Sequence, residues 1–223
     1  MGLPRLPLEE WAGPPPGVER VPGSGDVLWI GRGAAHPWLA PLRATLREAG
    51  RIWAPELQVL SVPTAASARN PWTFKPDQRA PLRWSMGGVE CTDLAELRPA
   101  DASADGLVLD GVLAGLGAQA ARTMLQQCAA LLAPDAPWLL LEPNGRFLPA
   151  VVANLRRPEA ERGEGRGTLR AVEELRRLLE PAGLGLERAC ALPAGRGRLA
   201  RAARGLLGRD LAAPWLVVLG RRI

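Results

Sequence analysis

Two glycines, Gly31 and Gly33, follow an apolar run at residues 26–30 and stand where a helix could begin. A continuous apolar run is typical of a parallel strand that is buried on both faces. Glycines after such a strand allow backbone N–H groups to approach an anionic or polar ligand at the start of the next helix. The spacing therefore indicates a ligand site, although glycines also serve simply to turn the chain tightly, and both interpretations stay open.

Histidine and cysteine offer few further reactive groups. His36, the only histidine, follows the glycine turn and could act as a base or contact a substrate, or merely cap a helix. Cys91, Cys128 and Cys190 are odd in number and far apart, so they show neither a disulfide framework nor the spacing of a zinc site. We expect buried free thiols and no metal site.

The composition is that of a globular protein. Of the 223 residues, 47% are hydrophobic and 23% are charged, which is enough apolar material for one large domain with a sizeable core. Prolines and glycines crowd residues 1–25, so we expect an irregular lead-in there and a domain over residues 26–223. No apolar run approaches the roughly 20 residues that span a bilayer, and no signal peptide is visible, which indicates a cytoplasmic protein.

Positive charge is concentrated in the second half of the chain. The net charge is +5, and residues 146–223 contain 16 arginines and 8 acidic residues. A basic half could attract phosphate-bearing partners. The acidic residues are interleaved with the arginines, however, and aromatic stacking groups are scarce there. Nucleic acid is therefore the less favoured partner and a small-molecule substrate the favoured one, and the sequence does not indicate an oligomeric state.

A strand and a helix must position the glycine turn. The apolar run predicts a strand at residues 26–31, and leucines at helical spacing predict a helix that ends near residue 49. A second strand fits either residues 51–56, which end on an acid able to bind ribose hydroxyls, or residues 58–63, which end without one. The second placement is favoured because its residues have the better strand composition.

The stretch at residues 92–110 carries several features in a fixed order. An acid, Asp93, is followed by Leu97, and a turn rich in acidic and small residues leads into an apolar strand that ends on Asp110. This order resembles the segment between strands 3 and 4 of the type 11 class I methyltransferases. The resemblance extends from about residue 26 to residue 222, and its later features are a helix at residues 120–132, a strand at residues 138–144 and a closing strand at residues 215–221.

The resemblance implies an α/β fold, the Rossmann-like sandwich of class I methyltransferases, with a mainly parallel seven-stranded sheet and an antiparallel last strand. It also implies S-adenosyl-L-methionine (SAM) as the cofactor. In that family the glycines would lie against the methionyl and ribose portion, the first acid against the adenine amino group and the second acid against the sulfonium or the acceptor. The cofactor-binding residues implied in this way are Gly31, Gly33, Asp93, Leu94 and Asp110.

The glycine turn more narrowly resembles that of an uncharacterised proteobacterial branch of the family with a degenerate glycine motif. Three features depart from the wider pattern. Ala35 replaces the third glycine, the favoured placement of the second strand ends without an acid, and Ala114-Gly115 replaces a glutamate-histidine pair after strand 4. Each implied site residue also has a purely structural interpretation, with the glycines as turn formers and the two acids as helix caps.

The function implied is SAM-dependent transfer of a methyl group to an unidentified, small-molecule acceptor. No catalytic residue is assigned, because an activated methyl group needs a base only when the acceptor is protonated. The alternative is a methyltransferase-fold protein that has lost transfer and acts as a binding or regulatory partner. An open cleft above the glycine turn would favour the enzyme, and bulky side chains filling it would favour the alternative.

Overall fold

The computed structural model describes residues 26–31, 39–58, 82–98, 103–148, 151–152, 170–192, 211 and 213–223. The predicted lead-in at residues 1–25 and the candidate residues Gly33 and His36 lie outside these ranges. The helices of the described part are α1 (Ala40–Glu48), α2 (Ala118–Ala130) and α5 (Val172–Leu179), with short 3₁₀ turns η4 (Leu94–Leu97), η5 (Leu113–Gly115) and η6 (Glu180–Ala182).

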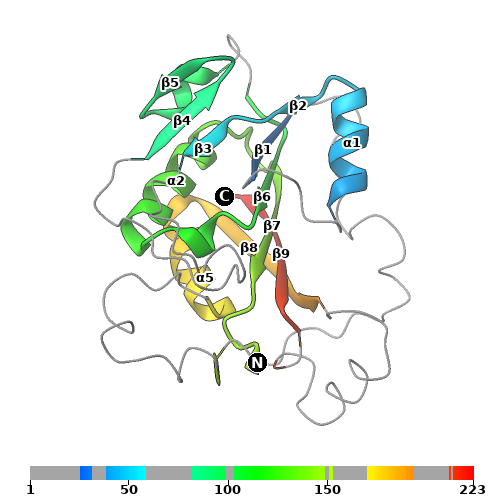
Figure 1. Ribbon diagram of the computed structural model, residues 1–223, viewed down its shortest axis with the longest axis vertical. Helices are drawn as coiled ribbons and strands as arrows, with labels where there is room; N and C mark the ends of the chain where they lie inside the picture. The colour runs from blue at the N-terminus through cyan, green and yellow to red at the C-terminus, as the bar shows by residue number, and fades with distance from the viewer. Residues whose placement is uncertain are drawn as a thin grey trace.

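Six of the described strands form one large sheet of mostly parallel strands (Figure 1). The order across it is β2-β1-β6-β7-β9-β8, and β9 runs antiparallel to both of its neighbours. The strands are β1 (Val27–Gly31), β2 (Ile52–Trp53), β6 (Gly106–Asp110), β7 (Pro137–Pro143), β8 (Leu184–Leu192) and β9 (Trp215–Arg222). The expected Rossmann-like fold with an antiparallel last strand is confirmed, and the described sheet holds six strands where seven were predicted.

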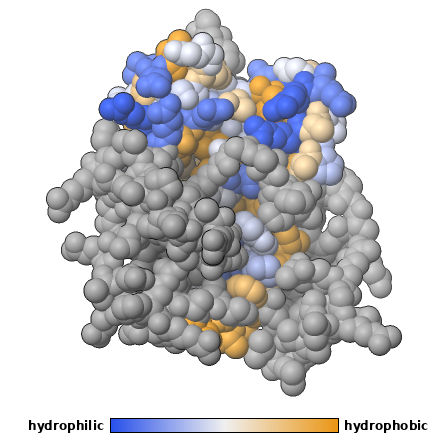
Figure 2. All heavy atoms as spheres, in the orientation of Figure 1, coloured by the Kyte–Doolittle hydropathy of each residue, from blue (hydrophilic) through white to orange (hydrophobic). Residues whose placement is uncertain are grey.

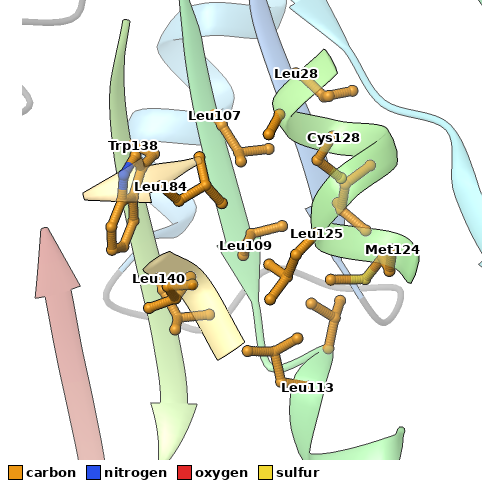
Figure 3. Close-up of a cluster of buried hydrophobic side chains, with 14 of the residues drawn as sticks. Leu28, Leu107, Leu109, Leu113, Met124, Leu125, Cys128, Trp138, Leu140 and Leu184 are labelled. Carbon is orange, nitrogen blue, oxygen red and sulfur yellow. The ribbon is translucent and has the colours of Figure 1, made fainter. Parts of the chain in front are cut away.

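The central strands follow from their apolar runs. β1 and β6 are buried on both faces, which is the environment that a continuous apolar strand requires. Helix α1 covers one face of the sheet, while α2 and α5 cover the other (Figure 1). On the α2 side, leucines of β6 and β7 pack against Met124, Leu125 and Cys128 of α2 (Figure 3). This two-sided burial holds the carboxyl ends of β1 and β6 side by side.

The predicted position of the second strand was wrong. β2 pairs with β1 through Ile52 and Trp53, so the strand follows the placement at residues 51–56 and not the favoured one at residues 58–63. Trp53 is buried in the core, and burial of this large side chain outweighs the better strand composition of the later residues. With this placement an acid, Glu56, follows the strand, which removes one apparent departure from the methyltransferase pattern.

A second, three-stranded antiparallel sheet lies beside the main one. It consists of β3 (Glu56–Gln58), β4 (Arg83–Met86) and β5 (Val89–Cys91), in that order. Hydrophilic side chains gather over this sheet and over α1 on the exposed surface (Figure 2). None of the helices in the described ranges is long and apolar enough to cross a membrane.

One glutamine joins the small sheet to the main domain. Trp84 of β4 is fully buried, and its Nε1 donates to Oε1 of Gln127 on α2 over 2.7 Å. Nε2 of the same glutamine donates to the Thr92 carbonyl oxygen over 3.1 Å. The amide thus satisfies a buried indole and a loop carbonyl at the same time.

We expect Gln127→Met to lower the free energy of unfolding by about 1–2 kcal/mol, because it leaves the buried Trp84 N–H without its partner. The matched control is Gln126→Met, the same change at the exposed neighbouring position of α2, which should alter stability by less than about 0.5 kcal/mol. Urea unfolding followed by circular dichroism measures both values. Equal effects in the two variants would contradict the structural role of Gln127.

Candidate functional site

The candidate site lies where β1 and β6 end. These strands are adjacent and parallel, and Gly31 is paired in register with Asp110. From β1 the chain continues to β2 on one side, whereas β6 lies on the other side, so the strand order reverses between β1 and β6. In open α/β sheets, ligands bind outside the carboxyl ends of the strands at such a switch point. The structure therefore brings two of the five predicted site residues together.

Gly31 presents a surface without a side chain at this edge. A Cβ atom built on Gly31 would lie 3.2 Å from Nε1 of Trp29 and 3.6 Å from Cβ of Asp110. The position that a side chain would take is therefore bounded by the Trp29 indole and by Cβ of Asp110. Because glycine has no side chain, the ring edge of Trp29 can pack directly against the backbone of Gly31.

Asp110 carries a carboxylate at this edge and is buried, with only 6% of the residue exposed. It ends β6, and the next residue, Gly111, turns the chain with a φ of 66°. The Gly111 N–H donates to the Leu141 carbonyl oxygen over 2.8 Å, which ties the turn to β7. Glycine is suited to this left-handed backbone conformation, which residues with a side chain rarely adopt.

The loop that follows Asp110 is held by a buried acid on β7. Oε1 of Glu142 accepts from the Leu113 N–H over 2.6 Å, and Oε2 accepts from the Ala114 N–H over 2.9 Å. Glu142 is only 2% exposed. A carboxylate that accepts two backbone N–H groups is a strong, geometrically specific anchor for a loop.

A buried arginine holds the same loop through its carbonyl groups. The guanidinium of Arg170 donates from Nη1 to the Leu113 oxygen and from Nη2 to the Leu116 oxygen, the second over 2.7 Å. Burial lowers the pKa of Arg170, and the nearby carboxylates of Glu142 and Glu174 oppose that shift. Glu142 thus binds backbone N–H groups of this loop, and Arg170 binds its carbonyl groups. Together they fix the loop beside the candidate site.

Arg170 lies just before helix α5. The helix begins at Val172, and Oε2 of Glu174 accepts from the Ala171 N–H over 2.9 Å. Arg170 forms an isolated parallel bridge with Asn144, and its side chain bonds to the loop after β6. Glu173, in the first turn of α5, pairs with Arg146 over 3.1 Å.

Asp93 and Leu94 form a helix cap in the structure. Oδ1 of Asp93 accepts from the Ala95 N–H over 3.0 Å at the start of η4, and the Asp93 carbonyl accepts from Sγ of Cys91. The side chain of Leu94 is fully buried in the core, so only its backbone could meet a ligand. No hydrogen bond in the described ranges links this cap to Gly31 or Asp110.

The cysteines do not supply a nucleophile at this edge. Cys128 and Cys190 are buried free thiols as predicted, whereas Cys91 is free but only partly buried. Burial raises the pKa of Cys128 to about 12 and that of Cys190 to about 11, which keeps both protonated near neutral pH. Within the described ranges, no group of three or more potential metal ligands is present.

Sequence reasoning missed Trp29, Glu142 and Arg170. A lone acid at the end of the apolar run in residues 138–143 was a signal for Glu142, because an unpaired charge is rarely buried. Arg170 gave no such signal, since its partners are backbone oxygens of a distant loop. The role of Trp29 depends on where its ring edge points, which the sequence does not specify.

Comparison with known structures identifies the fold. A SAM dependent methyltransferase from Archaeoglobus fulgidus is 13% identical, with a TM-score of 0.53 over 96% of this chain and 93% of that one. A putative sarcosine dimethylglycine methyltransferase from Galdieria sulphuraria is 16% identical, with a TM-score of 0.50 over 96% of this chain and 84% of that one. These similarities show that the chain has the class I methyltransferase fold.

A third solved structure matches this chain over only part of its own length. The protein TnmH is 18% identical, with a TM-score of 0.49 over 90% of this chain, and the matched region spans about half, 51%, of TnmH. No protein-family model matches the sequence, and neither does any curated protein.

Proposed function

We propose that the protein is a SAM-dependent methyltransferase, of the type 11 kind and the proteobacterial branch described above, that acts on a small-molecule acceptor. The observation that carries the proposal is the pairing of Gly31 with Asp110 at the point where the strand order reverses. The fold shared with the methyltransferase from Archaeoglobus fulgidus supports it.

The residues at this edge fit such a ligand. SAM combines a nucleoside with a zwitterionic amino acid, so its site needs a surface open to the backbone together with donors and acceptors. Gly31 has no side chain, Asp110 carries a carboxylate, and Trp29 has a buried N–H without a hydrogen-bond partner in the described part of the chain. The unpartnered indole N–H of Trp29 is a group that a polar ligand would satisfy.

The chain's own residues would divide the binding between them. Gly31 and Gly33 would admit the methionyl and ribose portion, and Asp110 would face the sulfonium or the acceptor. Asp93 would accept from the adenine amino group through Oδ2, since Oδ1 already caps η4, and the Leu94 backbone would lie beside it. Glu56, three residues after β2, stands where an acid could accept from ribose hydroxyls.

Bound SAM would supply an activated methyl group on a sulfonium. The protein then has to align the acceptor and exclude water, which yields most of the rate by positioning. Glu142 and Arg170 fix the loop beside Asp110, so they would keep that wall of the site in one geometry. No residue is required to act as a base unless the acceptor carries a proton.

We expect Gly31→Ala to weaken binding of SAM and of S-adenosylhomocysteine at least about tenfold, because the added methyl group would lie 3.2 Å from Nε1 of Trp29 and would displace the edge that Gly31, Trp29 and Asp110 form. The matched control is Gly106→Ala. Gly106 lies on the same strand pair at the amino edge, where an added Cβ would meet Pro137 O at an ordinary 3.5 Å. Calorimetric titration of both variants measures the affinities. The same titration applies to Gly33→Val, for which we expect no binding.

The titration also separates the two functions. Wild-type protein that binds neither SAM nor S-adenosylhomocysteine would contradict the proposal and leave the alternative, a methyltransferase-fold binding or regulatory protein. Equal affinity of wild type and Gly31→Ala would place the cofactor elsewhere in the molecule. Binding that is lost in Gly31→Ala and kept in Gly106→Ala is the expected result.

A further inference from the structure

Trp29 carries a buried indole N–H that has no hydrogen-bond partner among the described residues and lies beside Gly31. Within the described ranges, three buried tryptophans have an Nε1 atom without a hydrogen-bond partner: Trp29, Trp53 and Trp138. Trp138 lies near the start of β7, where its ring packs against Gly220. Trp53, on the edge strand β2, is paired with Leu28, three residues before the end of β1. Only Trp29 faces the residue that ends β1 at the candidate site.

The ring edge of Trp29 points toward Gly31. A Cβ on Gly31 would lie 3.2 Å from Nε1 and 3.6 Å from Cδ1 of the indole, so the edge that bears the N–H packs against the backbone of Gly31, in the space that a side chain would take. Trp29 is 1% exposed. A buried donor without a partner is costly, and a ligand acceptor at this position would recover that cost.

We infer that Trp29 is a specificity-determining residue that donates from Nε1 to the carboxylate of the amino-acid portion of bound SAM. This inference rests on the proposed function. An indole N–H can only donate, so it cannot take the ammonium group of the ligand and must meet an acceptor oxygen. The two acceptors near the glycine turn would be the carboxylate and the ribose hydroxyls.

Charge favours the carboxylate. The guanidinium carbon of Arg43 lies 5.6 Å from the centroid of the Trp29 ring, which places a positive charge against the indole. A cation at this distance stabilises an anionic oxygen on the indole N–H more than a neutral hydroxyl. With the carboxylate at Trp29, the ammonium group of the zwitterion is free to lie toward the Asp110 carboxylate on the neighbouring strand.

The test compares two ligands and two variants. S-adenosylhomocysteine has the amino-acid portion, whereas 5′-methylthioadenosine keeps the ribose and adenine but lacks it. We expect Trp29→Phe to weaken binding of S-adenosylhomocysteine about tenfold and to leave binding of 5′-methylthioadenosine unchanged, as measured by calorimetry. Trp138→Phe is the matched control, because it removes another unpartnered indole far from the site edge, and it should leave both affinities unchanged.

The other possible outcomes distinguish a failure of the proposed function from a failure of this inference. Failure of the wild-type protein to bind S-adenosylhomocysteine would overturn the proposed function and this inference with it. Wild-type binding that Trp29→Phe does not change would overturn this inference alone. An equal loss for both ligands would assign the donor to the ribose and overturn the carboxylate assignment, and an equal loss in Trp29→Phe and Trp138→Phe would reveal a general effect on the core.

A direct readout tests the hydrogen bond itself. The chain has 8 tryptophans, and the indole N–H signal of Trp29 in a ¹⁵N-labelled sample is the one that Trp29→Phe removes. We expect this signal to move downfield on addition of S-adenosylhomocysteine, since a hydrogen bond to a carboxylate deshields the proton. A Trp29 signal that stays in place while the ligand binds would overturn the inference.

Discussion

Gly220→Ala lowers the free energy of unfolding by at least about 3 kcal/mol, because β9 has no room for a side chain at this position. A Cβ atom there would collide with the backbone oxygen of Gly185 on β8 and with the ring of Trp138 on β7, where Cε2 would lie only 2.6 Å away. Both neighbours are held by the sheet, so neither can move cheaply. Urea unfolding followed by circular dichroism measures the loss.

Gly106→Ala again provides the control, because Gly106 is also a strand glycine in the same sheet. An added Cβ meets Pro137 O at 3.5 Å and Cγ2 of Val27 at 3.8 Å, which are ordinary contacts. Alanine also restricts the unfolded chain, so this variant should be as stable as the wild type or slightly more stable. Similar unfolding midpoints for the two variants would show that β9 does not pass between β7 and β8 as described.

Glu142→Gln lowers the free energy of unfolding by about 3 kcal/mol, because both carboxylate oxygens accept buried backbone N–H groups. The amide NH₂ of glutamine would face one of these donors, and the buried Arg170 would lose a nearby negative charge. The loop after Asp110 would then loosen, so we also expect weaker binding of S-adenosylhomocysteine. Chemical unfolding and calorimetry measure the two effects.

Glu173→Gln is the matched control for this change. Glu173 forms an ion pair with Arg146, but its side chain is 59% exposed, and such pairs contribute little. Combining Glu142→Gln with Arg170→Met completes a double-mutant cycle, for which we expect a coupling of about 1 kcal/mol or more. Additive effects of the two changes, or a loss from Glu173→Gln as large as that from Glu142→Gln, would contradict the joint anchoring of the loop.

These two sites have different relations to function. Gly220 supports the sheet at the amino end of β7, where Trp138 is paired with it, so its replacement affects the whole fold. Glu142 supports a loop at the carboxyl edge, beside Asp110 and Gly31. A partly destabilised Glu142→Gln protein should therefore lose affinity for the cofactor under conditions in which it is still folded.

The sequence by itself determined the central architecture. The apolar runs of β1, β6, β7 and β9 each required burial on both faces, and their alternation with helical segments required a layered α/β sheet. It also indicated the glycine turn and the acid at the end of β6, because the end of a buried strand is readable from local composition. The predicted helix at residues 120–132 is confirmed within two residues as α2.

The tertiary structure alone decided which residues meet. The position of β2 depended on burying Trp53 against the core, and local strand propensity pointed to the wrong residues. The loop after Asp110 is fixed by Glu142 and Arg170, which come from segments 28 residues apart in the chain and bond mainly to the backbone. The backbone partners of Glu142 and Arg170 do not alter any side-chain pattern, so these contacts could not be predicted from the sequence. The direction of the Trp29 ring edge toward Gly31 depends on packing against α1, so it could not be predicted either.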